Sequence, residues 1–169
     1  MKEKEPSWMD TFKVEYEKEK YREKKRDIDD EKVEETLKSI NSNLPVIFEN
    51  CFRCCRNHVL FKGYDFSRRT YLENGKKVEV FSMFVKRNDV SVSMVLVNEE
   101  IKRFISVYIN GFGVPNMNTV FSFIKDFFDE DFIRSYFVVL EEKKEQEEKE
   151  AEKISKKTKA NLNRFFKGT

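Results

Sequence analysis

Apolar and polar residues alternate along the middle of the chain, from Val78 to Asn110. Period two places successive side chains on opposite faces of a sheet, and the apolar positions are mostly β-branched or aromatic, as strands favour. The polar breaks are short enough for hairpins, and Asn74-Gly75 suits the positive φ angles of a type I′ turn. The pattern predicts four consecutive antiparallel strands, at 66–73, 76–86, 90–98 and 102–110. Ser91, Ser93 and Ser106 fall on one face, which we expect to be solvated or to cover a partner.

Helical periodicity flanks these strands. Asn43 can cap a helix that has Pro45 in its first turn, and Gly63 can end this helix. After a loop at 111–115, one helix should begin near residues 116–118, and Asp129 or Asp131 should cap another. Both helices should cover the apolar side of the sheet with residues at helical spacing: Val120, Phe121, Ile124, Phe127, Phe128, Phe132, Ile133, Tyr136, Phe137 and Leu140.

Charged residues dominate both ends of the chain. Residues 1–43 mix acidic and basic side chains around a thin apolar stripe, as in an exposed helix that packs loosely or only with a partner. Residues 141–153 are almost all Glu and Lys, which favours a solvated helical spacer that frays into a flexible tail. The sequence therefore predicts an α+β fold. It consists of a charged helical arm (1–43), a core domain (44–140) with helices covering a four-stranded antiparallel meander, and a charged helical spacer with a basic tail (141–169).

The composition of the chain indicates the cellular compartment in which we expect the protein. The chain of 169 residues has no apolar run of about 20 residues, so we expect no membrane span. Its first residues lack the hydrophobic core of a signal peptide, and three cysteines within five positions do not make a disulfide framework. These features favour an intracellular protein of the cytoplasm or nucleus. Although the net charge of the chain is only +2, its tail is basic, because no acidic residue follows Glu152.

The three cysteines and the single histidine lie on one predicted helix. Cys51, Cys54, Cys55 and His58 are spaced i, i+3, i+4 and i+7, and thiolate and imidazole are ligands that zinc prefers. However, four ligands from one helix cannot easily surround a metal, and the chain has no second Cys or His pair. We therefore favour a core face in which Cys acts as a small hydrophobe, and expect no metal and no cofactor. A metal site and a reactive thiol are the alternatives.

Basic residues interleaved with aromatic ones suggest contact with nucleic acid. Arg68 and Arg69 open the first strand beside Tyr64, Phe66 and Tyr71, and such a pattern can bind single strands by stacking and phosphate contact. Ordinary surface charge is the alternative, as it is for the basic cluster at 22–26. The candidate nucleic-acid-binding residues are Arg53, Arg56, Arg68, Arg69, Lys156 and Lys157.

No residues show a recognisable catalytic spacing. His58 has no obvious acidic partner in the sequence, and the acidic residues of the core follow no catalytic pattern. Carboxylates from distant segments could still gather around Mg²⁺, as in nucleases. A metal-dependent nuclease is therefore the least favoured function, and no catalytic residue is assigned.

The last residues carry apolar side chains that a charged tail cannot bury. Leu162, Phe165 and Phe166 stand at i, i+3 and i+4, on one side of a helical turn, as in helix-in-groove recognition. Docking of the tail on its own domain, and a basic-aromatic contact with nucleic acid or membrane, are the alternatives.

This tail resembles the PIP box, by which replication and repair proteins bind the archaeal or eukaryotic sliding clamp. That box has Gln, two residues, an aliphatic residue, two residues and two aromatic residues. Leu162 matches the aliphatic position and Phe165 and Phe166 match the aromatic pair, whereas Lys159 replaces the Gln. The resemblance covers about eight residues, and implies that the apolar residues fill a hydrophobic pocket under the clamp's connecting loop.

These observations predict a non-enzymatic accessory or regulatory protein of DNA replication or repair. Its tail would dock on a protein partner such as a sliding clamp, and nucleic acid is a second candidate partner. The alternative is a small viral or mobile-element adaptor or inhibitor that binds one protein and makes no nucleic-acid contact. The salt dependence of any nucleic-acid binding distinguishes the two, because phosphate contacts release counterions.

Overall fold

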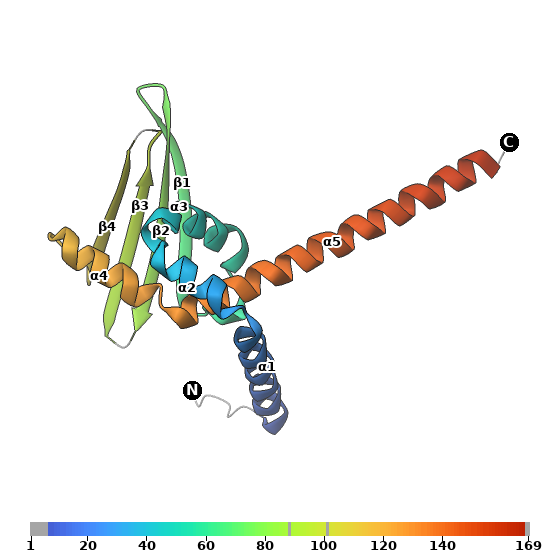
Figure 1. Cartoon of the computed structure of the whole chain (residues 1–169), viewed down its shortest axis with the longest axis horizontal. Coiled ribbons are helices and arrows are strands. Elements are labelled where there is room, and N and C mark those ends of the chain that lie inside the picture. Colours follow the sequence, from blue (N-terminus) through green and yellow to red (C-terminus); the bar gives the residue numbers. More distant parts are fainter. Residues whose placement is uncertain (1–6, 88, 101, 168–169) are drawn as a thin grey trace, which may run out of the picture.

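The computed structural model describes residues 7–87, 89–100 and 102–167. Three helices come first, followed by two irregular helical turns, a sheet and two more helices. The elements are α1 (Trp8–Asp27), α2 (Asp30–Lys38), α3 (Ile40–Asn50), a π-helical turn (Cys51–Cys55), a 3-10 turn (Val59–Phe61), β1 (Tyr64–Glu73), β2 (Lys76–Arg87), β3 (Val90–Asn98), β4 (Arg103–Ile109), β5 (Phe112–Gly113), α4 (Met117–Phe127) and α5 (Glu130–Lys167). In Figure 1, α1 and the far part of α5 project from a body of sheet and helices.

The sheet is an antiparallel meander in the order β1-β2-β3-β4-β5. Each of the four predicted strands agrees with an observed strand to within two residues at either end. The turn between β1 and β2 is formed by Asn74 and Gly75, whose φ angles are 52° and 77°. The α+β class and the first hairpin are thus confirmed.

The prediction of four strands was wrong, because a short fifth strand follows β4. Asn110 and Gly111 have φ angles of 48° and 85°, and beyond them Phe112 pairs with Ile109. The segment was predicted as a loop on account of its glycines and Pro115. Asn110-Gly111 nevertheless repeats the Asn-Gly signal of the first hairpin and makes the same kind of turn.

Helices cover one face of the sheet, and the core lies between them. Cross-strand pairs such as Phe81 with Leu96 and Met83 with Met94 point into this core and are almost fully buried. Helices α4 and α5 and the C-cap residue of α4 add residues that are all buried and all expected from helical spacing: Val120, Ile124, Phe128, Phe132, Ile133, Tyr136 and Phe137. Three other predicted core positions are only partly covered, namely Phe121, Phe127 and Leu140.

The helix predicted from Asn43 to Gly63 begins earlier and ends sooner. Helix α3 begins at Ile40, because Ile40 and Leu44 are buried one turn apart, so Asn43 is not its cap and Pro45 lies in its second turn. Pro45 cannot donate to the carbonyl of Asn41, which instead accepts a hydrogen bond from Arg103 at 3.2 Å. The helical run ends with the π-helical turn, after which Asn57 adopts a φ of 70°.

Part of the segment expected to form the N-terminal arm contributes to the core. Ile28, Val33 and Ile40 are buried in the same cluster as the sheet residues, whereas α1 itself has no buried residue. The guanidinium of Arg134 on α5 donates to the carbonyls of Lys25 and Ile28, each at 3.1 Å. These bonds fasten the end of α1 to α5.

Helix α5 runs without interruption for 38 residues, from Glu130 to Lys167. Asp129 caps it, as predicted, by accepting a hydrogen bond from the amide of Phe132 at 2.8 Å. The expectation that the spacer frays into a flexible tail was wrong, because Glu, Lys, Gln and Ala between 141 and 160 are strong helix formers. Within the described residues, no helix is both long and apolar enough to cross a membrane.

Candidate functional site

The end of α5 presents an exposed apolar stripe. Leu162, Phe165 and Phe166 are 51%, 73% and 71% exposed, and Ile154 is also exposed. At 100° per residue these four side chains fall on one side of the helix, and the rings of Phe165 and Phe166 meet edge to face at 5.7 Å. Such exposure contradicts the alternative in which the tail packs on its own domain.

The charged spacer holds this stripe away from the body. From Glu141 to Lys167 an α-helix extends about 40 Å, and Figure 1 shows the later part of α5 standing clear of the other elements. Lys159 lies beside Leu162 and Phe166 on the wheel, whereas five other cations occupy the opposite side. These cations are Lys153, Lys156, Lys157, Arg164 and Lys167.

A polar cluster at the base of the projecting part joins α1, the 3-10 turn region and α5. Glu142 accepts from Lys24 at 2.9 Å and lies 3.0 Å from Nε2 of His58. Nδ1 of His58 accepts from the amide of Leu60 at 3.1 Å, and the Tyr21 ring meets the imidazole edge to face. Both ring nitrogens of His58 are therefore engaged within the protein, and the cluster fixes α1 against α5.

This acidic partner of His58 was missed at the sequence level. Glu142 lies 84 residues further along the chain, in a run of glutamates that are otherwise mostly exposed. Burial alone raises the pKa of Glu142, but hydrogen bonds from Lys24 and His58 outweigh it and hold the pKa below its ordinary value. Burial and the negative charge of Glu142 raise the pKa of Tyr21.

Replacing Glu142 with Gln should lower the thermal unfolding midpoint at neutral pH, and this difference should shrink in acid. Because the folded-state pKa of Glu142 lies below 4.5, its ionised form stabilises the fold above that pH, and the contribution is lost as pH falls through the folded-state pKa. Circular dichroism melts from neutral pH to about pH 3 measure the difference. Glu148→Gln, at an exposed position of α5, is the control. A deficit in E142Q that is independent of pH would contradict this account.

The cysteines are placed as core residues. Cys51 and Cys55 are fully buried in the central cluster, which confirms the core interpretation for both, and Cys54 packs against that cluster half-buried. Burial raises the pKa of the Cys51 thiol well above its ordinary value, which disfavours a thiolate. Across residues 7–87, 89–100 and 102–167, no group of three Cys, His, Asp or Glu side chains is placed to hold a metal ion.

The six candidate nucleic-acid-binding residues do not share one surface. Arg53 bonds to Asn50 at 3.0 Å and Arg56 lies over the ring of Phe52, next to the π-helical turn. The strand register places Arg68 opposite Phe81 and Arg69 opposite Val80, on different faces of the sheet. Arg68 also pairs with Glu79 at 2.9 Å. Lys156 and Lys157 lie on the projecting part of α5.

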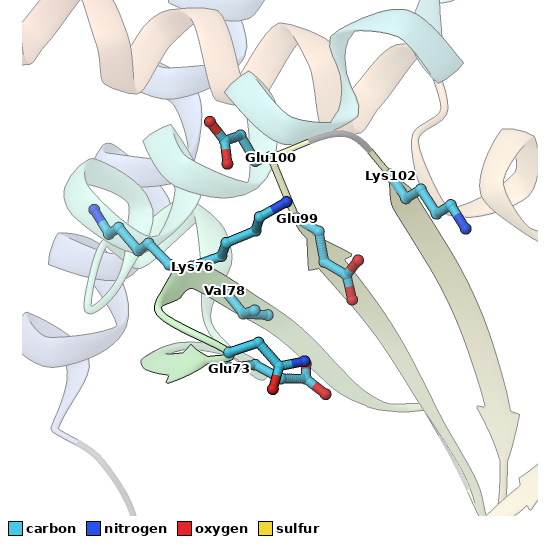
Figure 2. Close-up of a pocket in the computed structure, with 8 residues that line it drawn as sticks. Glu73, Lys76, Val78, Glu99, Glu100 and Lys102 are labelled. Carbon is cyan, nitrogen blue, oxygen red and sulfur yellow. The ribbon is translucent and has the colours of Figure 1, made fainter.

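The face of the sheet that turns away from the core is more apolar than predicted. The register places Ser93 between Phe84 and Tyr108, and it places Phe104 opposite Val97. Exposed aromatic rings therefore flank the serines that were predicted to lie on this face. One end of this face holds a shallow pocket of about 360 Å³ around Val78. Figure 2 shows Glu73, Lys76, Glu99 and Lys102 about it, a balance of charges that selects no particular ligand.

No family model matches the chain, and comparisons with curated proteins and with solved structures also find no match.

Proposed function

We propose that this chain is a non-enzymatic docking protein of DNA replication or repair, which presents the end of α5 to a hydrophobic groove on a protein partner such as a sliding clamp. The observation that best supports this function is the exposed stripe of Leu162, Phe165 and Phe166 on a projecting helix. Burial of the three side chains in a partner would contribute roughly 5–9 kcal/mol before the cost of association.

The chemistry of the tail defines the groove that fits it. The stripe requires an apolar floor, and the cations on the opposite side of the helix favour an acidic rim. Lys159, in place of the Gln of a PIP box, can donate hydrogen bonds but cannot accept them. A clamp that binds this tail would therefore hold the position of Lys159 through acceptor groups alone.

The adaptor or inhibitor remains the second candidate function. It is favoured by the dispersal of Arg53, Arg56, Arg68 and Arg69, since nucleic-acid binding relies on cations gathered along one surface. Weak binding of an oligonucleotide with little dependence on salt would support this candidate over a DNA-contacting protein.

The proposed function is tested by truncating the chain after Lys153. The full chain should bind an archaeal or eukaryotic sliding clamp in a pull-down and in a direct titration, and the truncated chain should not. Both should unfold at nearly the same temperature, because residues 154–167 bury nothing against the body. Equal binding by the two chains would place the interface elsewhere, and absence of clamp binding by either would reject the clamp as the partner.

A further inference from the structure

A groove runs between α1 and the segment 59–62, beside the Glu142 cluster, whose Tyr21 is part of its lining. Its volume is about 700 Å³. Helix α1 lines it with Val14, Lys18, Tyr21 and Lys25, which recur every three or four residues and so form one face of the helix. The lining is completed by Glu17, Arg22, Arg26, Val59, Leu60, Lys62 and Asp131. Figure 1 shows α1 leaving the body near the start of α5.

The floor of the groove is aliphatic and open. Val14 and Val59 are 49% and 50% exposed, and Leu60 is half-buried between the groove and the core. Exposed aliphatic groups in a concave site stabilise a ligand that brings its own apolar groups.

The rim carries an excess of positive charge. Five cationic side chains line the groove against two carboxylates, Glu17 and Asp131. Lys25 pairs with Asp131 at 3.2 Å. Among the residues that the structure describes, neither Arg26 nor Lys62 has an ion-pair partner. These two cations are therefore available to a ligand.

We propose that this groove binds an acidic amphipathic segment of a protein partner. Its aliphatic side chains would lie on Val14, Val59 and Leu60, and its carboxylates would pair with Arg26, Lys62 and their neighbours. The lined face of α1 spans about 16 Å from Val14 to Lys25, which accommodates about 11 residues of helix or five of strand.

The floor distinguishes a peptide from a nucleic acid. Tyr21 is the only aromatic residue in the lining, and its ring is engaged by His58 at 5.5 Å and by the ammonium of Lys24 at 5.4 Å. A stacking base would have to displace these contacts, and the exposed aliphatic side chains of Val14 and Val59 favour the apolar groups of a peptide over a base. The proposal concerns a second surface and does not depend on the function assigned to the tail.

Fluorescence anisotropy with the full chain tests the proposal. The probe is a labelled peptide of about 11 residues with leucine at i, i+3, i+4 and i+7 and glutamate elsewhere. It should bind, whereas the same peptide with lysine for glutamate should not. Arg26→Glu combined with Lys62→Glu should weaken binding by about tenfold or more. Lys125→Glu combined with Lys143→Glu, which makes the same charge change at exposed sites outside the groove, should leave binding unchanged.

Two further variants test whether the peptide binds in this groove and not at another site. Val59→Ser should weaken binding of the acidic peptide while leaving the melting temperature nearly unchanged, because Val59 is half exposed. The chain truncated after Lys153 should bind the peptide as the full chain does. Failure of the acidic peptide to bind, or equal loss in both charge-reversed chains, would overturn the proposal. A thymidine oligonucleotide that binds more tightly than the acidic peptide would also overturn the proposal, if Arg26→Glu with Lys62→Glu weakens its binding and Val59→Ser leaves its binding unchanged. That result would assign the groove to nucleic acid.

Discussion

Replacing Phe128 with Ala is expected to lower the free energy of unfolding by about 3–5 kcal/mol. Phe128 is 1% exposed, and its ring meets Phe48 of α3 at 5.8 Å and Phe132 of α5 at 4.8 Å, both edge to face. The substitution would open a cavity where α4, α3 and α5 meet, and neighbouring aromatic rings cannot collapse into it without losing their own contacts.

Urea denaturation measures this loss, and Phe121→Ala is its matched control. Phe121 lies on α4, whose C-cap is Phe128, and is 37% exposed, so its truncation should cost about 1–2 kcal/mol, clearly less than the loss at Phe128. Equal m values in the native and variant chains would show that the comparison concerns stability alone. If F128A and F121A were equally mild, the three helices would not meet at Phe128 as described.

The sheet could be predicted because its signal is local. Period two along β2, β3 and β4 depends only on neighbouring residues, and the register that pairs Met83 with Met94 follows from the turn. Strand β5 was missed although Asn110-Gly111 carries the same local signal as Asn74-Gly75, because Phe112 and Gly113 are too short a segment to show alternation. The start of α3 was misplaced because Pro45 resembles a first-turn proline, whereas a side chain from β4, Arg103, satisfies the carbonyl that Pro45 leaves free.

The two surfaces differ in how far the sequence indicates them. The stripe on α5 is visible in the sequence because Leu162, Phe165 and Phe166 are neighbours on a segment that has no core to join. The α1 groove cannot be recognised in the sequence, because Val14 and Val59 lie 45 residues apart. They are brought together by contacts between side chains that are distant in sequence. Those contacts include Lys24 with Glu142, and Arg134 with the carbonyls that end α1. Pairings of this kind depend on how the helices pack, which periodicity does not specify.

Replacing Phe165 and Phe166 together with Ala is expected to weaken binding of the partner by about a hundredfold, close to 3 kcal/mol. Both rings are more than two-thirds exposed and touch each other, so their removal should leave the melting temperature nearly unchanged. Trp8→Ala with Phe12→Ala is the matched control, because these aromatic residues are also exposed and lie on a projecting helix, α1. Isothermal titration with the partner and a thermal melt of each chain provide the two measurements. Equal weakening in both double variants would indicate nonspecific hydrophobic association, and a large fall in melting temperature would indicate that the tail supports the fold.

Lys159→Gln determines whether the partner groove is that of a sliding clamp. In the PIP box that the tail resembles, this position holds a Gln, which both donates and accepts hydrogen bonds, whereas Lys159 only donates. If the clamp is the partner, the substitution restores the missing acceptor, and binding should strengthen although a positive charge has been removed. If the partner is instead an acidic groove of another kind, loss of the charge should weaken binding, and more so at low salt because the lost interaction is electrostatic. The sign of the change in affinity therefore separates a clamp from other partners, in a substitution at an exposed position that leaves Leu162, Phe165 and Phe166 in place.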